Sequence, residues 1–160
     1  ASRIIREVTG KSGAIFIVND RVDIALISGA DGVHLGQNDL PVAEIRGLIG
    51  PDRIIGLSTH DVKEAVEAET LGADYISLGP IFPTRSKKDA HPPRGLPLIS
   101  EIRKAVRLPI VAIGGITQEN MEDVFKAGAD SAAMISGILT ERDISAKAAS
   151  IVSMIGRLGA

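Results

Sequence analysis

Hydroxyl and ammonium side chains follow the apolar stretch YISLGPIF, and together they could bind an anion. Thr84, Ser86 and Lys87 stand at near-alternate positions after Gly79 and Pro80. Two hydroxyl donors and one positive charge could hold a phosphate or a diphosphate. Most Lys-rich and Pro-rich turns are simply solvated basic loops, so the phosphate interpretation needs support from elsewhere in the chain.

Backbone donors for the same anion are indicated at two further places. The stretches IGGI (113–116) and MISG (134–137) end the last two apolar runs, and the glycines of IGGI and the end of MISG would supply these donors. In parallel barrels, phosphate sites commonly lie in the loops after the last two strands, where N–H groups face the anion. Donors at one strand end could arise by chance, but donors at three strand ends that converge on one anion are less expected by chance.

Two carboxylates at neighbouring strand ends could bind a metal or cap helices. Asp20 follows Asn19 in FIVND, and Asp39 ends the segment HLGQND. Asn and Asp are favoured N-caps, and capping is their commoner role. The two carboxylates could instead meet on Mg²⁺, which takes one or two carboxylates together with phosphate oxygens and water. Spacing alone leaves both interpretations open.

The segment LSTH adds Ser58 and His60 at the end of another apolar run. A hydroxyl and an imidazole suggest nucleophilic catalysis, but no triad spacing supports it, so we expect a polar pocket wall. His34 lies within GVHL, where we expect a hydrogen-bonded interior histidine and not a ligand.

Six short apolar runs alternate with helical segments and would position these groups. The runs are AIFIV (14–18), GVHL (32–35), RIIGL (53–57), YISL (75–78), PIVAI (109–113) and SAAMI (131–135). This alternation predicts a parallel sheet. FIVNDRVD lacks G-x-G-x-x-G, which disfavours an open doubly wound sheet and favours a (β/α)8 TIM barrel. About the last six of its βα units are visible, so we expect residues 1–160 to form a single partial TIM-barrel domain.

The first residues and a recurring tripeptide refine this expectation. ASRIIREVTGKSG lacks an initiator Met, and its apolar residues have helical spacing, so we expect the chain to begin inside a helix after two missing βα units. Gly-Ala-Asp recurs at 29–31, 72–74 and 128–130, where Gly would end a helix in the left-handed region. An open barrel would expose two sheet edges and favour a homo-oligomer.

Composition excludes several classes of function. The chain has 160 residues, a net charge of −2 and 2% aromatic residues, which argues against nucleic-acid binding. It has no Cys, so disulfides and thiolate sites are excluded. No apolar run has the ~20 residues of a membrane span, and no signal sequence is evident. We therefore expect a cytoplasmic protein.

Taken together, these motifs resemble the thiamine-phosphate synthase family. FIVND, ADGVHLGQND, GLSTH, DYISLGPIFPTRSKK, PIVAIGGI and AGADSAAMIS occur in the family's order, and the similarity runs from about residue 3 to the last helix. The resemblance implies a (β/α)8 transferase that joins hydroxymethylpyrimidine diphosphate to thiazole phosphate. In the family, pyrophosphate leaves first and the thiazole nitrogen attacks the resulting pyrimidine-methyl cation. Such a site needs positive charges that stabilise the departing pyrophosphate, and it has less need of a strong protein base.

The resemblance also implies roles for individual residues. Asp20 and Asp39 would hold Mg²⁺, and Asn19 would contact the pyrimidine diphosphate. Ser58 corresponds to the family's active-site serine, and Lys87 to a lysine on the diphosphate; these two are the predicted catalytic residues. The thiazole phosphate would be bound by Thr84, Ser86, Gly115, Ile135 and Ser136. Ser86 replaces the usual threonine but keeps the hydroxyl.

One departure leaves alternatives open. The family's Gln, Arg and Lys motif, which grips the pyrimidine diphosphate, does not occur before Phe16. We therefore expect a fragment that keeps thiazole-phosphate binding and loses coupling. Thiazole tautomerase relatives share the barrel and the GGI motif, but they generally lack the set Asn19, Asp20 and Asp39. A non-catalytic phosphate-ligand-binding module is the alternative outside the enzymes, and the reading frame upstream of Ala1 would discriminate.

Overall fold

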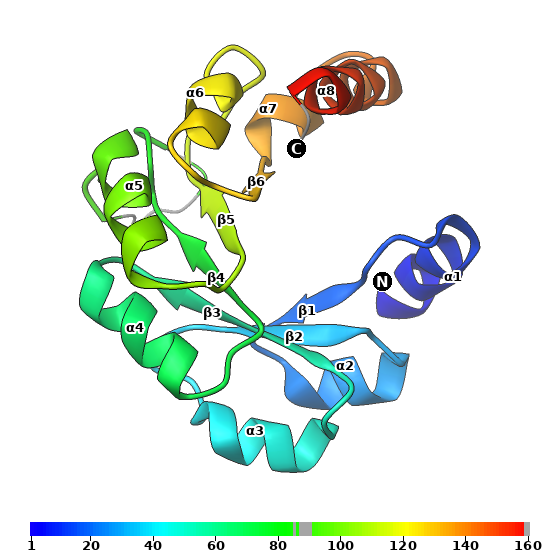
Figure 1. Cartoon of the computed structure of the whole chain (residues 1–160). Coiled ribbons are helices and arrows are strands. Elements are labelled where there is room, and N and C mark those ends of the chain that lie inside the picture. The colour runs from blue at the N-terminus through cyan, green and yellow to red at the C-terminus, as the bar shows by residue number, and fades with distance from the viewer. Residues whose placement is uncertain (85, 87–90, 159–160) are drawn as a thin grey trace.

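The computed structural model describes residues 1–84, 86 and 91–158, which form one six-stranded parallel sheet with helices between the strands (Figure 1). The strands are β1 (Ile17–Asn19), β2 (Gly32–Leu35), β3 (Ile54–Thr59), β4 (Tyr75–Leu78), β5 (Ile110–Ile113) and β6 (Ser131–Ala133). The helices are α1 (Ser2–Ser12), α2 (Val22–Ser28), α3 (Val42–Ile49), α4 (Val62–Thr70), α5 (Leu96–Ala105), α6 (Met121–Lys126), α7 (Ser136–Leu139) and α8 (Ile144–Leu158). Each predicted apolar run overlaps a strand, so the parallel α/β prediction is confirmed.

The sheet curves into an arc, with α2 to α6 on its convex side (Figure 1). Its strands follow one another in sequence order from β1 to β6, as in a TIM barrel. In the described part of the chain, β1 and β6 each pair with one neighbour only. The fold is therefore a half-barrel of the TIM-barrel type.

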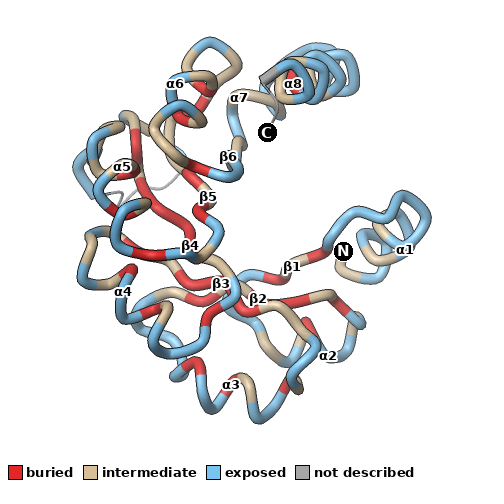
Figure 2. Tube along the Cα trace, viewed as in Figure 1, coloured by how far each residue is buried: buried red, intermediate tan, exposed pale blue. Residues whose placement is uncertain are grey.

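The hydrophobic core lies between the strands and the helices. Strand residues that point outward, such as Val33, Ile55 and Ile76, are fully buried beneath the helices. Ile45 of α3 and Ile99 of α5 are equally inaccessible and pack against them. In Figure 2 the buried positions accordingly follow the sheet and the facing sides of the helices, whereas α1 has none.

The inner face of the arc differs from the apolar interior that continuous strand hydrophobicity predicts. Its residues are mostly polar or small, and they include Asn19, His34, Gly56, Tyr75 and Ser77. Tyr75 and Ser77 belong to YISL, in which the outward-facing Ile and Leu supply the apolar character. This face is therefore free to line a polar site.

A recurring set of polar contacts connects alternate strands to the helices at the amino-terminal ends of the strands. In each Gly-Ala-Asp repeat the carboxylate accepts the N–H of a residue near the start of the preceding strand. The pairs are Phe16 to Asp31 at 2.7 Å, Ile55 to Asp74 at 2.7 Å and Ile110 to Asp130 at 2.8 Å. Each carboxylate also binds an arginine, and these pairs are Arg6–Asp31, Arg46–Asp74 and Arg103–Asp130.

We call each Asp carboxylate, together with the strand N–H that it accepts and the arginine that it binds, a carboxylate clasp. Each clasp Asp also donates its own N–H to the same strand residue's carbonyl, at 2.9, 2.8 and 3.0 Å. The clasps occur at β1, β3 and β5, so the structural repeat is two βα units. The preceding glycines have φ values of 63°, 81° and 109°, which confirms their predicted helix-ending role. The aspartates thus join each strand to two helices and do more than complete a turn.

In the part of the chain that the structure describes, no helix combines the length and the apolar character that a membrane span requires.

Candidate active site

One cavity of about 580 Å³ lies at the carboxyl ends of the strands. It brings together eight of the ten predicted site residues, namely Asn19, Asp20, Ser58, Thr84, Ser86, Gly115, Ile135 and Ser136. Asp39 lines an adjoining cavity of about 460 Å³, which Asp20 and Ser58 also line. Lys87 lies outside the described residues. Residues from six separate strand ends thus meet at the edge where a TIM barrel carries its active site.

The loop after β4 is fixed against the loop after β5. Ile81 donates its N–H to Ile113 O at 2.9 Å, and Phe82 donates to Gly114 O at 3.0 Å, which continues the pairing of the two strands. Gly114 and Gly115 have φ values of 89° and 64°. A Cβ at Gly115 would collide with Phe82, so glycine permits this close packing. The loop that carries Thr84 and the IGGI loop therefore form one wall.

Local hydrogen bonds shape this wall further. The Ser86 N–H donates to Thr84 Oγ1 at 3.2 Å, so the backbone of Ser86 lies against the Thr84 hydroxyl. Asn120 accepts the Thr117 N–H at 2.9 Å and donates to the Gly115 carbonyl at 3.0 Å. Asn120 thereby anchors the IGGI loop from behind.

The predicted acidic pair caps no helix. Asp20 has φ of 61° and donates its N–H to His34 O at 2.8 Å. Helix α2 is instead preceded by Arg21, without a side-chain cap. Asp39 accepts the Gly36 N–H at 2.6 Å, and Pro41 precedes α3. The capping interpretation is therefore wrong for both carboxylates.

Two further carboxylates, Asp61 and Glu64, line the smaller cavity, but Asp61 caps α4 and Glu64 binds His60. Among the described residues, no three His, Asp or Glu side chains converge as a metal-binding group. Asp20 and Asp39 both face the smaller cavity, together with the side chains of Gln37 and Asn38. Two carboxylates beside an open space suit Mg²⁺, which completes its coordination with water and phosphate oxygens.

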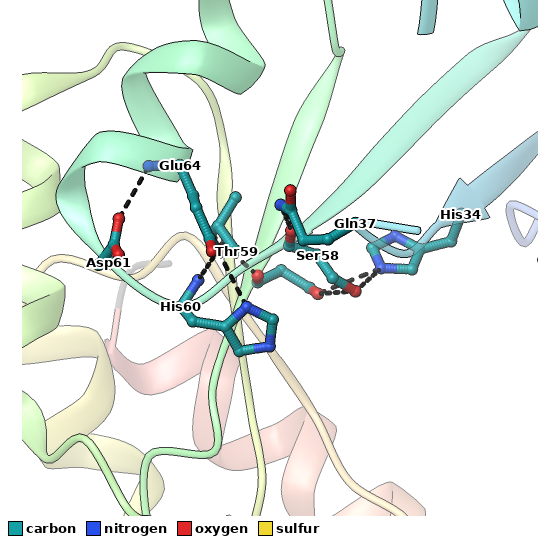
Figure 3. Close-up of polar contacts among 8 residues, drawn as sticks. His34, Gln37, Ser58, Thr59, His60, Asp61 and Glu64 are labelled. Atoms are coloured by element: carbon teal, nitrogen blue, oxygen red, sulfur yellow. Dashed lines mark hydrogen bonds and ion pairs between the residues drawn. The ribbon is translucent and has the colours of Figure 1, made fainter. Parts of the chain in front are cut away.

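A hydrogen-bonded network crosses the floor of the main cavity. His34 Nε2 lies 3.0 Å from Ser58 Oγ and 3.2 Å from Ser77 Oγ (Figure 3). His34 Nδ1 lies 2.9 Å from the hydroxyl of Tyr75, whose ring stacks on the imidazole at a centroid separation of 5.4 Å. Gln37 Nε2 holds the Ser58 carbonyl at 2.5 Å. The expectation that His34 is a hydrogen-bonded interior histidine is confirmed.

Burial sets the charge states of this network. Burial lowers the pKa of His34, although the negative charges of Asp20 and Asp39 oppose part of this effect. Burial raises the pKa of Tyr75 to about 12. At neutral pH the imidazole is therefore uncharged and the phenol keeps its proton.

His60 lies on the rim of the cavity and is held by a carboxylate. Its Nδ1 lies 2.9 Å from Glu64 Oε2, which also accepts the His60 N–H at 2.7 Å. Asp61 caps α4 by accepting the Glu64 N–H at 2.8 Å, so the helix start fixes Glu64 (Figure 3). The prediction that Ser58 and His60 form a polar pocket wall is confirmed.

Comparisons with known proteins agree with this geometry. The family model described as "Thiamine monophosphate synthase" matches residues 1–138. The chain belongs to this family. The thiamine-phosphate synthase of Methanoculleus marisnigri is 54% identical over 151 residues, which are 94% of this chain and 72% of that protein. That of Methanosarcina barkeri is 52% identical over 157 residues, 98% of this chain and 70% of that protein.

A solved structure in the same family has the same fold. The thiamine phosphate pyrophosphorylase from Pyrococcus furiosus superposes with a TM-score of 0.90 at 38% identity, over 98% of this chain and 75% of that chain. The resemblance inferred from the motifs is thus confirmed.

Several residues of the site, among them Tyr75, Ser77 and Asn120, were not singled out from the sequence. Tyr75 and Ser77 were included only in an apolar run, although their alternate spacing in YISL marks one face of a strand. Asn120 lies in a segment where its side chain could equally have been a helix cap. Its contact with Gly115 depends on a turn that sequence spacing does not reveal.

Proposed function

We propose that this protein is a thiamine-phosphate synthase that couples hydroxymethylpyrimidine diphosphate to thiazole phosphate with release of pyrophosphate. The observation that carries the proposal is the single cavity lined by eight of the ten residues marked by the family motifs. Their chemistry divides the cavity into a hydroxyl-rich and glycine-rich end and an acidic end. This division suits one phosphate ester and one metal-bound diphosphate.

Thiazole phosphate is assigned to the end formed by Thr84, Ser86, Gly115, Ile135 and Ser136. Two arguments support this assignment. Thr84 and Ser86 line the same cavity, and the Ser86 N–H donates to Thr84 Oγ1. The positive φ of Gly115 and its anchoring by Asn120 fix the IGGI backbone at the same wall. Fixed donors bind an anion without a further ordering cost.

The pyrimidine diphosphate is assigned to the acidic end. Asp20 and Asp39 would hold Mg²⁺ there, and Asn19 and Ser58 would contact the substrate. Bound Mg²⁺ would supply positive charge to the diphosphate leaving group. The chain's own contribution is to orient the diphosphate and the pyrimidine ring toward the thiazole nitrogen. His34 and Ser77 keep the floor polar beneath them.

Lys87 is assigned to the diphosphate on the strength of its motif alone. Lys87 and its neighbour Lys88 both lie outside the described residues. The proposal predicts that Lys87→Ala slows coupling by orders of magnitude, because a charge on the leaving group is lost, and that Lys88→Ala has little effect. Equal effects of the two substitutions would restore the interpretation as a solvated basic loop.

We also propose that the working enzyme closes the half-barrel with two further βα units. The unpaired outer edges of β1 and β6, among the described residues, support this closure. In the family the strand that carries the Gln, Arg and Lys motif belongs to this region. Assembly into a homo-oligomer and a location in the cytoplasm stay predictions.

The test of the proposed function uses calorimetry and turnover together. The protein made as its gene encodes it should release pyrophosphate from the two substrates. The chain of 160 residues, once circular dichroism shows it folded, should bind thiazole phosphate. Thr84→Val should weaken that binding about 10- to 100-fold, as expected for a charge-assisted hydrogen bond. The matched control Thr70→Val removes a hydroxyl that bonds within α4 and should change nothing. Undetectable thiazole-phosphate binding by folded protein would contradict the assignment.

A further inference from the structure

Tyr75 and His34 form a relay that ends at the hydroxyl of Ser58. The register of the sheet places His34, Gly56 and Tyr75 side by side on three neighbouring strands. Because Gly56 has no side chain, the Tyr75 ring crosses over β3 and its hydroxyl reaches His34 Nδ1 at 2.9 Å. The other imidazole nitrogen lies 3.0 Å from Ser58 Oγ. Both ring nitrogens are therefore engaged.

The partners of the Tyr75 hydroxyl determine where the imidazole proton lies. Within the described residues, this hydroxyl reaches a single hydrogen-bond acceptor, His34 Nδ1. The phenol donor is satisfied within this network only when its O–H donates to Nδ1. An imidazole nitrogen that accepts a hydrogen bond carries no proton, which leaves the ring proton on Nε2. His34 therefore donates from Nε2 toward Ser58.

The position of this proton decides what Ser58 offers to the cavity. Ser58 Oγ accepts from His34 Nε2–H at 3.0 Å, and Ser77 Oγ donates to it at 3.5 Å. Both lone pairs of Ser58 are then directed at the floor network. Its own O–H finds no acceptor in that network and points toward the cavity that Ser58 lines. With the proton on Nδ1, Ser58 would instead donate to Nε2 and offer the cavity only lone pairs.

We propose that Tyr75 is a positioning residue that, through the Nε2–H tautomer of His34, holds the Ser58 hydroxyl as a hydrogen-bond donor to the pyrimidine diphosphate. This inference rests on the proposed function for the identity of the substrate. It assigns positioning roles to Tyr75 and His34, which act through Ser58. A diphosphate oxygen and an unprotonated ring nitrogen are both acceptors, and only a donating Ser58 can bind them.

The first test reads the tautomer directly and needs no activity. The chain has three histidines, so the ring nitrogens of His34 can be assigned by NMR with the variants His60→Gln and His91→Gln. The ¹⁵N shifts near neutral pH should show a protonated Nε2 and an unprotonated Nδ1. Tyr75→Phe removes the O–H without changing the ring and should give a mixture of tautomers. A protonated Nδ1 in the unmodified protein, or an unchanged tautomer in Tyr75→Phe, would overturn the proposal.

The second test asks whether Tyr75 acts through Ser58. In the protein made as its gene encodes it, Tyr75→Phe should weaken pyrimidine-diphosphate binding about 3- to 10-fold and leave thiazole-phosphate binding unchanged. In a Ser58→Ala background the same substitution should add nothing, because the hydroxyl that it orients is absent. Thr70→Val serves as the hydroxyl-deletion control. Additive effects of Tyr75→Phe and Ser58→Ala would overturn the relay.

A rescue experiment separates orientation from general packing. His34→Gln keeps an N–H donor near the Nε2 position, whereas His34→Asn places its amide near Nδ1 and leaves Ser58 without a donor. We expect His34→Gln to bind pyrimidine diphosphate several-fold more tightly than His34→Asn. Equal binding by the two variants would overturn the role of His34. If the unmodified protein binds no pyrimidine diphosphate, the proposed function fails, and the NMR result still decides the tautomer.

Discussion

The ring of Tyr75 occupies the space in which a Cβ atom at residue 56 would lie, one strand away. Gly56 is therefore required by its neighbour and not by its own backbone angles, since its φ is not positive. The missing side chain lets Tyr75 of β4 reach His34 of β2 across the intervening strand. One glycine thus connects the three strands beneath the cavity.

Replacement of this glycine should disrupt the floor network. Gly56→Ala would drive a methyl group into the Tyr75 ring, and overpacking of this kind costs about 1–3 kcal/mol of unfolding free energy. Urea denaturation monitored by circular dichroism would measure the loss. Gly47→Ala is the matched control, because its Cβ would meet nothing within 4 Å and α3 should gain about 0.5–1 kcal/mol. Equal stability of the two variants would show that Tyr75 does not depend on the space above Gly56.

The carboxylate clasp should contribute more to stability than its exposed ion pair suggests. Asp74→Ala removes the acceptor of the N–H of Ile55, a fully buried residue. A buried donor left unpaired costs about 1–3 kcal/mol, whereas the exposed contact with Arg46 adds little. The unfolding midpoint in urea should fall accordingly. Asp23→Ala is the control, because it breaks an exposed ion pair with Arg21 and should leave the midpoint unchanged. An equal fall of the midpoint in both variants would show that the clasp contributes no more than a surface ion pair.

The sequence predicted the strands because short apolar runs alternate with helical segments along the chain. It also indicated that Thr84, Ser86 and the IGGI loop would lie together, and all of them line the main cavity. Their binding of phosphate stays a prediction. The clasp was not predicted, because Arg46 and Asp74 are 28 residues apart and meet only when α3 and β4 pack on β3. The caps at Asp20 and Asp39 were predicted wrongly. Backbone contacts with His34 and Gly36, invisible in the sequence, fix these two residues instead.

The acidic pair should determine the metal requirement of the enzyme. Asp20→Asn exchanges a charged oxygen for a neutral one, and Asn tolerates the φ of 61° at this position, so the fold should persist. Pyrophosphate release should be lost at ordinary Mg²⁺ and return in part when Mg²⁺ is raised roughly tenfold or more. Asp52→Asn, on an exposed turn, is the control. Activity equal to that of the unmodified protein at every Mg²⁺ concentration would remove Asp20 from the metal site.

The stability of the fold should decrease as the pH falls through the titration of His34. Burial lowers the pKa of His34 below its ordinary value of 6.5 in the folded protein, although Asp20 and Asp39 oppose this effect. As the pH falls below that ordinary value, the unfolded chain binds a proton that the folded protein does not. The free energy of unfolding must therefore fall, by up to ~1.4 kcal/mol per pH unit, until the folded pKa is reached.

Above the ordinary pKa, both states carry a neutral His34 and this contribution to the pH dependence disappears. Urea unfolding at pH values from ~7.5 to ~5 should reveal the slope, which should be shallower in His34→Gln because that side chain does not titrate. His60→Gln and His91→Gln show how much of the slope other histidines contribute. If His34→Gln retains the full slope, the cavity floor does not keep the His34 imidazole neutral. The Ser58 relay, which requires a neutral imidazole, would then be contradicted.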